Sequence, residues 1–302
     1  MKKILFVLAA ASMTMAAQAK ILRVSNVSGS SAPYKSISPA IRAAEEGDTI
    51  MVDASSTTYG NVTIDKRVVL LGPGYWLQEN GIIQEGGETA SADIWVGAKG
   101  VIIKGMTLTR LTIQGDQTVI SRCRVLNGIT IDNANNCIIH QNYCMYVAPY
   151  SLTDLKTSNH QITNNIMTGN TTGLYMGNFT NTLFAYNTCI GTEKPRMMGS
   201  NGNGKVLDCT IEHNVFIELP SIDMSNSMNN NTVPQIWPYK ASMTDKEVQK
   251  ALSNLTDGAF AGDDPYVLSG VPSGPVVQDL IVPTTVEKGS KMSVTVKVGV
   301  VK

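Results

Sequence analysis

Two pairs of side chains carry the residue types that polysaccharide chemistry uses. Lys194 and Arg196 lie in a long polar segment, GTEKPRMMGSNGNGK at 191–205. A lyase acting on an acidic polysaccharide needs a cation, or Ca²⁺, to neutralise a uronate, and a basic group to remove the proton beside it. Trp237 and Tyr239, in QIWPYK, offer rings on which a sugar could stack. Lys194 and Arg196 are the candidate catalytic residues, and a solvated loop is the simpler explanation for them. Trp237 and Tyr239 are the candidate substrate-binding residues, and the simpler explanation is that they cover the end of the fold.

The remaining ionisable side chains are scattered and predict no metal site. The three histidines occupy different positions relative to the sequence repeat described below, so they do not stack in one column. The acidic residues of the same region form no Asp-x-Asp cluster of the kind that Ca²⁺ favours. These residues are His140, His160, His213, Asp132, Asp154, Asp208 and Glu212. We therefore expect no cofactor, with Ca²⁺ entering only if the protein is a lyase.

The charge and composition of the chain limit its partners and its fold class. Lys and Arg together number 24, as do Asp and Glu, so no net field attracts nucleic acid or an anionic membrane. Only 16% of the residues are charged, while Asn, Thr, Gly and Val are abundant. This composition is typical of strands joined by many turns rather than of helices. It predicts an all-β protein with no nucleic-acid partner and leaves the oligomeric state open.

The first 19 residues have the pattern of a cleaved signal peptide. Two lysines follow Met1, the apolar run ILFVLAAA occupies 4–11, and the small-residue sequence AAQA ends at residue 19. Ser12 and Thr14 interrupt an apolar run that is already shorter than the roughly 20 residues of a membrane span. We therefore expect export to the periplasm, the cell surface or the medium, with no transmembrane span.

A short pattern recurs along the middle of the chain. A bulky apolar residue is followed three positions later by a small or polar marker, and the last five markers are 19, 23, 22 and 27 residues apart. A period near 20 with short strand-like pieces is the mark of a stacked solenoid, in which each coil covers the apolar face of its neighbour. The pairs are Ile102 and Gly105, Ile120 and Cys123, Ile139 and Asn142, Ile162 and Asn165, Phe184 and Asn187, and Ile211 and Asn214.

Four of the markers are asparagines, and their recurrence predicts a structural ladder. Asn142, Asn165, Asn187 and Asn214 are placed at an inward bend of successive coils. Asn tolerates left-handed backbone geometry, and its amide can bond the same amide one coil above and below. Nearer the N-terminus the pattern places Gly105 at the marker, with an earlier marker at Gly72.

The five cysteines are expected to be buried thiols rather than disulfides. Cys137 and Cys209 share a position in the repeat but lie three coils apart, roughly 14 Å at about 4.8 Å a coil. Cys144 and Cys189 lie two coils apart, about 10 Å by the same spacing. Both separations exceed the roughly 7 Å limit for a disulfide. With Cys123, these thiols act as small apolar residues.

The two ends of the solenoid are predicted to be covered. Near the start, Ser38 as N-cap, Pro39 at the first helical position and Gly47 as the stop predict a short helix that plugs the first coil. In TDKEVQKALSNL (244–255), Thr244 and Glu247 have capping-box spacing and an apolar stripe follows. The stripe consists of Val248, Ala251, Leu252 and Leu255.

Strand-like segments after residue 279 predict a terminal hairpin around EKGS (287–290) that closes the far end. We therefore divide the sequence into a signal peptide at 1–19, a solenoid with its N-terminal cap at 20–218, and a C-terminal loop, helix and hairpin at 219–302.

With these features in place, the sequence resembles the right-handed parallel β-helix superfamily, often called pectate-lyase-like. The resemblance lies in the entrance segments AIRAAEEGDTIMV and TTYGNVTIDKRVVLLGPG and in the repeat unit ITNNIMTGN. GPGYWLQENG (72–81) and GDDPYVLSGVPSGPVV (262–277) are similar to segments of uncharacterised secreted β-helix proteins of Bacteroidetes-type bacteria. The resemblance implies a single-stranded right-handed parallel β-helix, a fold that hosts lyases, hydrolases, esterases, epimerases and inert adhesins.

The catalytic motifs of that superfamily are not recognisable in this sequence. The Arg-x-Pro-x-x-Arg run of pectate lyases is missing, since EKPRMM (193–198) has a lysine, a proline and an arginine in another spacing. Three functions stay open. The leading one is non-catalytic binding of a glycan or a cell-surface component. The others are a divergent polysaccharide lyase or glycosidase, and a structural spacer of a surface assembly.

Overall fold

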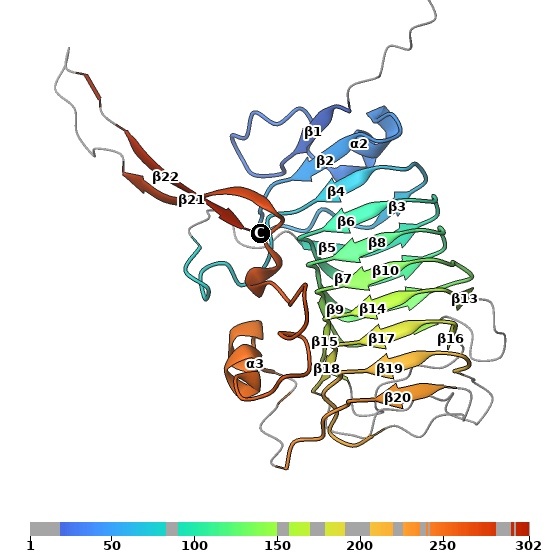
Figure 1. The fold of residues 1–302 in the computed structure, drawn as a ribbon. Helices are drawn as coiled ribbons and strands as arrows, with labels where there is room; N and C mark the ends of the chain where they lie inside the picture. Colours follow the sequence, from blue (N-terminus) through green and yellow to red (C-terminus); the bar gives the residue numbers. More distant parts are fainter. Residues whose placement is uncertain are drawn as a thin grey trace, which may run out of the picture.

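The chain folds into a stack of coils built from short parallel strands (Figure 1). The computed structural model describes residues 19–82, 90–149, 157–169, 179–190, 206–219, 226–235, 240, 242–281, 291–292 and 294–301. Every pair of neighbouring strands in its two large sheets is parallel. The fold is thus the parallel β-solenoid that the repeat predicts.

Most coils contribute a strand to sheet A followed by a strand to sheet B. Sheet A contains β1 (Ile21–Val24), β2 (Thr49–Val52), β4 (Val69–Leu71), β6 (Ile102–Lys104), β8 (Val119–Ser121), β10 (Ile138–His140), β14 (Gln161–Thr163), β17 (Leu183–Ala185), β19 (Thr210–Glu212) and β20 (Ser227–Asn229). Sheet B contains β3 (Val62–Ile64), β5 (Ala90–Val96), β7 (Thr107–Ile113), β9 (Arg124–Ile131), β11 (Tyr143–Cys144), β12 (Val147–Pro149), β15 (Ile166–Met167) and β18 (Thr188–Cys189).

A few elements lie outside these two sheets. They are the parallel pair β13 (Thr157–Ser158) and β16 (Phe179–Thr180), the antiparallel hairpin β21 (Gly274–Ile281) and β22 (Thr295–Val301), the helices α2 (Ile37–Ala43) and α3 (Asp245–Leu252), and a 3₁₀ turn at Leu268–Gly270. Within the described part of the chain, neither helix has the length and apolar character needed to cross a bilayer.

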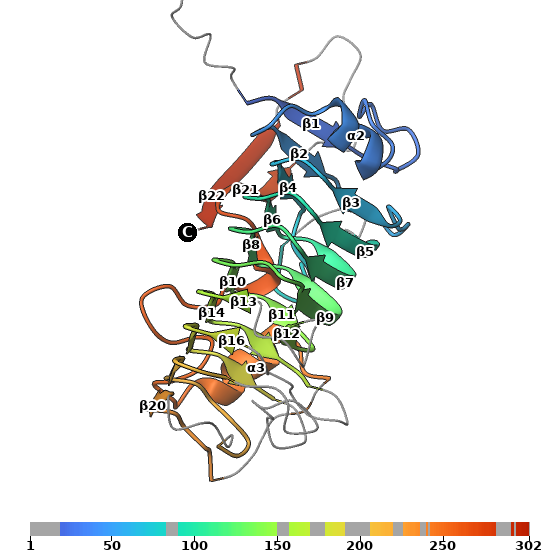
Figure 2. The same cartoon turned by 90° about the vertical axis from the view of Figure 1, so that its right-hand side faces the viewer.

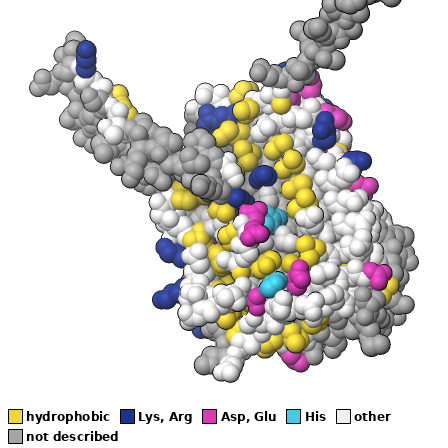
Figure 3. All heavy atoms as spheres, viewed as in Figure 1, with side chains coloured by type: hydrophobic (Ala, Val, Ile, Leu, Met, Phe, Trp, Pro, Cys, Tyr) yellow, Lys and Arg dark blue, Asp and Glu magenta, His cyan; other side chains and the backbone are white. Residues whose placement is uncertain are grey.

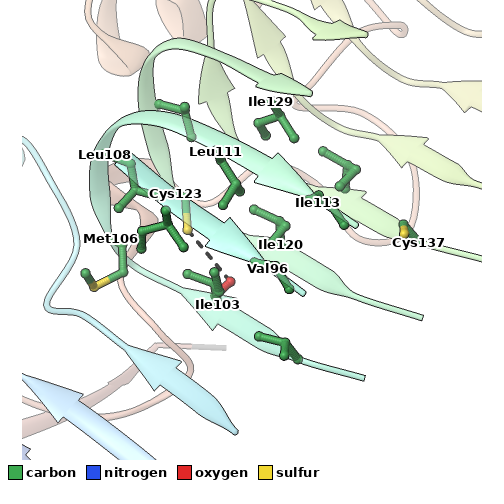
Figure 4. Packing of buried hydrophobic residues seen from close by; sticks show 14 of the residues in the cluster. Val96, Ile103, Met106, Leu108, Leu111, Ile113, Ile120, Cys123, Ile129 and Cys137 are labelled. Carbon is green, nitrogen blue, oxygen red and sulfur yellow. Dashed lines mark hydrogen bonds between the residues drawn. The ribbon is translucent and has the colours of Figure 1, made fainter. Parts of the chain in front are cut away.

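The core lies between the two sheets, inside the coils. The central residue of each sheet A strand is in register with its neighbours, so Ile103, Ile120 and Ile139 form one column with no solvent exposure. Figure 4 shows Ile103 and Ile120 of this column together with side chains of sheet B, among them Leu111 and Ile129. The stack of short strands is therefore stabilised because the aliphatic side chains of successive coils bury one another.

The inward marker at the bend between the sheets lies one residue later than predicted in the first coils. Ile103 pairs with Ile120, so Met106, not Gly105, occupies the inward position of Cys123. Gly105 instead has φ of 65°, matching Arg122 at 55°. The left-handed residue therefore precedes the marker. The predicted assignment of left-handed geometry to the asparagine markers is wrong for the same reason.

The four asparagines form a continuous inward ladder. All four are fully buried. The Nδ2 group of Asn142 donates to Oδ1 of Asn165 at 3.0 Å, and Asn165 donates in the same way to Asn187 at 3.0 Å. The backbone N–H of Asn142 also donates to the Oδ1 of Asn165, at 2.9 Å. Each amide thus pairs backbone groups that the bend removes from the strand ladders.

The ladder and the coils continue beyond residue 218. Asn187 donates to Asn214 at 3.0 Å, and Asn214 donates to Asn231 at 2.9 Å. Strand β20 pairs in parallel with β19 just before Asn231. The apolar-x-x-Asn pattern is present there as Met228 and Asn231, only 17 residues after Asn214.

A second inward ladder, made of mixed residues, lies at the opposite corner. The N–H of Cys137 donates to Nδ1 of His160 at 3.2 Å, and the N–H of His160 donates to Oγ1 of Thr182 at 3.3 Å. The N–H of Thr182 then donates to the sulfur of Cys209 at 3.4 Å. All five cysteines are buried and unpaired, which confirms their predicted state.

Helix α2 covers the first coil, with Ile37, Ala40 and Ile41 packed into the core. Its N-cap is Ser36 rather than the predicted Ser38, and Pro39 is the third helical residue. The first and the third helical positions both suit a proline, because the N–H groups of the first turn have no partner within the helix.

Helix α3 and its capping box are as predicted, with Thr244 and Glu247 bonded reciprocally. However, the described part of the C-terminal segment does not close the far end. It lies along the side of the coils and leads back to β21 and β22 beside the N-terminal half (Figures 1 and 2).

Replacing Asn165 by Leu should lower the free energy of unfolding by about 1–3 kcal/mol, because the N–H and Nδ2 groups of Asn142 lose their buried acceptor. Urea denaturation measures this change. Asn254→Leu, at an exposed position just after α3 with ordinary backbone geometry, is the control. An unchanged midpoint for Asn165→Leu would rule out the ladder as a stabilising element.

His160 should make stability depend on pH. Burial lowers the pKa of His160 from 6.5 to about 4, and its buried Nε2 has no partner among the described residues. Between pH 6.5 and 4, His160 is protonated in the unfolded chain but neutral in the folded one. The free energy of unfolding is therefore highest above pH 6.5 and decreases by about 3 kcal/mol as the pH falls towards 4. His160→Thr, which copies Thr182, should flatten this dependence in denaturation series. An equal slope in both proteins would contradict the assignment.

Candidate functional site

A C-terminal strap, defined here as residues 257–273, binds the outside of the bend between the two sheets. The left-handed residues before the markers direct their side chains to it, and together we call them the corner column. They are Arg122, Gln141, Asn164, Tyr186 and His213, all with φ between 53° and 56°. Because the residue after each of them points inward, these side chains point outward and line up from coil to coil.

The strap is held in reverse order along this column. Arg122 Nη1 donates to the Val271 carbonyl at 3.0 Å. Asn164 Nδ2 donates to the carbonyls of Ala259 and Ala261, at 3.1 and 2.9 Å. The strap is therefore antiparallel to the direction in which the coils advance, with its end near the N-terminal coils.

Gln141 and two histidines complete the attachment. Gln141 Nε2 donates to Oδ1 of Asp264 at 2.9 Å, and His140 Nε2 lies 3.0 Å from Oδ2 of the same carboxylate. His213 Nδ1 lies 2.9 Å from Oδ1 of Asp257. Figure 3 shows two histidines beside acidic groups on this face. Burial lowers the pKa of His140 despite its acidic partner.

A second apolar cluster lies under the strap and α3. The first residues of β11 and β15, Tyr143 and Ile166, point outward, and Val215 lies in the same column one coil beyond Thr188. Val248 and Leu252 of α3 and Ala259 and Tyr266 of the strap pack on them. The strap and α3 thus remove from water an apolar stripe that the coils alone would expose.

Next to this cluster, and sharing Tyr143 with it, is a pocket of about 290 Å³, which we call the aromatic pocket. Its walls come from sheet B, from the segment before α3 and from Trp76. The lining residues are Trp76, Arg124, Val125, Leu126, Tyr143, Cys144, Met145, Thr168, Gly169, Ser242 and Met243. The described lining combines two aromatic rings and several aliphatic side chains with the Arg124 guanidinium and the hydroxyl groups of Thr168, Ser242 and Tyr143, so that polar and apolar surface are nearly balanced.

The aromatic rings and the guanidinium of the pocket are packed on one another. The Trp76 and Tyr143 rings meet edge to face, with centroids 4.7 Å apart. The guanidinium carbon of Arg124 lies 4.4 Å from the Trp76 ring centre, a cation–π contact. The Tyr143 hydroxyl donates to the Met243 carbonyl, and burial raises the pKa of Tyr143. Tyr143 is therefore a wall of the pocket rather than a base.

A buried carboxyl group fixes the wall behind the pocket. Asp245, the first residue of α3, is fully buried, and burial raises its pKa while hydrogen bonds and Arg124 oppose the shift. Its Oδ2 accepts from the N–H of Ser269 at 2.6 Å, and its Oδ1 accepts from Asn80 at 3.2 Å. These bonds join α3, the strap and the segment that carries Trp76.

Comparison with known families agrees with this geometry. Residues 100–244 match the family model described as "Right handed beta helix region". This part of the chain is a right-handed β-helix. Neither the search of curated proteins nor that of solved structures found a match. The narrower likeness to Bacteroidetes-type secreted proteins stays a prediction.

The candidate residues from the sequence lie outside the described residues of the β-helix. Lys194 and Arg196 fall in 191–205, and Trp237 and Tyr239 fall in 236–239. Within the described part of the chain, no group of three or more His, Cys, Asp or Glu side chains could hold a metal ion.

Sequence reasoning missed the residues of the aromatic pocket. Trp76 stands in the quoted segment GPGYWLQENG, but nothing in the sequence pairs it with Arg124 or Tyr143, far away in the chain. One signal was available. A bulky apolar residue follows the marker at Tyr143, Ile166 and Val215, where strand alternation predicts an outward position. That stripe indicates that something covers this side of the β-helix.

Proposed function

We propose that the protein is exported through its N-terminal signal peptide and binds a glycan in the aromatic pocket without transforming it. The observation that carries the proposal is the set of Trp76, Tyr143 and Arg124 around one concave site of about 290 Å³. A sugar ring has an apolar C–H face and polar edges. It fits a pocket of aromatic and aliphatic walls with a few polar groups at the rim.

The ionisable groups of the site favour binding over catalysis. Glycosidases use two carboxyl groups on opposite sides of the scissile bond. The described lining residues carry one charged group, the Arg124 guanidinium, and its neighbour Asp245 is buried behind the wall in a hydrogen-bonded position. A guanidinium beside a ring can hold a hydroxyl or carboxylate of a sugar by directed hydrogen bonds.

Substitution of Trp76 by Ala should weaken glycan binding about tenfold or more, since an aromatic anchor in a central pocket carries much of the binding energy. Arg124→Ala should weaken it further for acidic than for neutral glycans. The mature protein is screened on a glycan array of acidic and neutral polysaccharides, and the affinity of each hit is measured by titration calorimetry.

Two controls match these changes. Trp95→Ala removes a half-buried tryptophan of β5, and Arg110→Ala removes an exposed arginine of β7; neither lines the pocket. Equal losses in control and pocket variants would refute this pocket as the binding site. Release of unsaturated uronates or new reducing ends from any hit would overturn the non-catalytic part of the proposal. Absence of any hit would favour a structural spacer.

A further inference from the structure

The aromatic pocket is assembled from three parts of the chain, which are the coils, the segment that carries Trp76 and the segment before α3. Arg124, Tyr143 and Thr168 belong to the coils, whereas Ser242 and Met243 precede α3. Among the described residues, bonds from the C-terminal segment to the coils and to the Trp76 segment hold these walls together, such as those of Met243 with Tyr143 and of Lys246 with Glu79. The geometry of the pocket therefore depends on residues that do not line it.

Ser269 joins the strap to the segment that carries Trp76 and to the start of α3. Its Oγ donates to the Trp76 carbonyl at 3.1 Å and accepts from Asn80 at 2.7 Å. Its N–H donates to Asp245 at 2.6 Å, and its carbonyl accepts from the N–H of Tyr75 at 2.8 Å. One fully buried serine thus connects the Trp76 segment, the start of α3 and the strap.

Both ends of this connection have left-handed backbone geometry. Ser269 has φ of 63° and Trp76 has φ of 47°. A bulky residue such as tryptophan rarely adopts this conformation and keeps it only where surrounding contacts enforce it. The bonds from Ser269 and Asn80 to the Trp76 carbonyl are such contacts, at 3.1 and 3.3 Å.

Side chains of the corner column hold the strap on both sides of Ser269. Asn164 holds Ala259 and Ala261, Gln141 holds Asp264 and Pro265, and Arg122 holds Val271. Arg122 is itself fixed by a bond from its Nε to Oε1 of Gln141 at 2.8 Å. The attachment therefore continues from coil to coil up to Val271, which directly follows the turn that contains Ser269.

We infer that the corner column and Ser269 are positioning residues for the aromatic pocket, holding Trp76 and the segment before α3 in the arrangement that binds ligand. This inference rests on the proposed function for its affinity readout. The placement of Trp76 is measurable without any ligand. Loosening the strap at Asn164 frees the Trp76 wall although Asn164 is not a lining residue.

The test compares Asn164→Ala with Asn181→Ala, a left-handed asparagine at the opposite, exposed bend whose amide donates to Asn159. Both changes are made in full-length mature protein with Trp95 and Trp237 replaced by Phe, so that Trp76 is the only tryptophan. Acrylamide quenching of Trp76 fluorescence reports the wall, glycan titration reports affinity, and circular dichroism reports the melting of the coils.

Asn164→Ala should raise the quenching of Trp76 and weaken the affinity about fivefold to tenfold, as expected for the loss of one or two buried hydrogen bonds. Ser269→Gly, which tolerates the left-handed backbone and removes the hydroxymethyl side chain, should do the same. The Asn181→Ala variant should match the parent.

Unchanged quenching in both Asn164→Ala and Ser269→Gly, with folded coils, would overturn the inference. If quenching responds but no glycan binds even the parent protein, the positioning role stands and the proposed function fails. A response only where the coils themselves melt earlier would show a general loss of stability and would also overturn it.

Discussion

The coils from Asn142 to Asn231 each depend on one buried side-chain amide. Where the chain bends from sheet A into sheet B, a backbone N–H faces inward and leaves the strand ladder. In the dry interior such a group must find a partner. The asparagine of the next coil supplies the acceptor, and its own Nδ2 is satisfied by the amide and carbonyl groups around it. Aliphatic burial stabilises the coils, but the amide ladder fixes where each coil bends.

The outward surface follows from this inward constraint. At each bend the marker side chain points into the core. The residue before the marker has left-handed backbone geometry, and its side chain points to the outer surface. Stacking repeats that position from coil to coil, which produces the corner column and, two residues later, the apolar stripe of sheet B. The strap and α3 attach to these two columns. A pocket then forms where the repeating and the non-repeating parts of the chain meet, which is where function is usually added to a solenoid.

The sequence predicted those features that local spacing and composition encode. The period, the asparagine ladder, the buried thiols and the capping box of α3 all rest on residues close together in the chain or at equal intervals. The marker was misplaced at Gly105 because glycine has no side chain to separate the inward position from the left-handed one. Ser36 and Ser38 are both suitable caps, so the start of α2 was assigned two residues too late.

The course of the C-terminal segment and the pocket could not be predicted in this way. The hydroxyls of Tyr75 and Tyr266 meet across 191 positions of the chain, and Arg122 meets Val271 across 149. Such contacts have no periodic signal. Only the apolar residues after the markers indicate that a cover exists, and they do not identify it.

The central claim is that the amide ladder is the most persistent part of the structure and the strap an attachment to it. Native-state hydrogen exchange, resolved by residue, measures this directly. The account predicts that the N–H groups of Asn142, Asn165 and Asn187 exchange only through global unfolding, while those of Ala259 and Tyr266 exchange earlier by opening of the strap. Ladder amides that exchange as fast as the strap amides would contradict it.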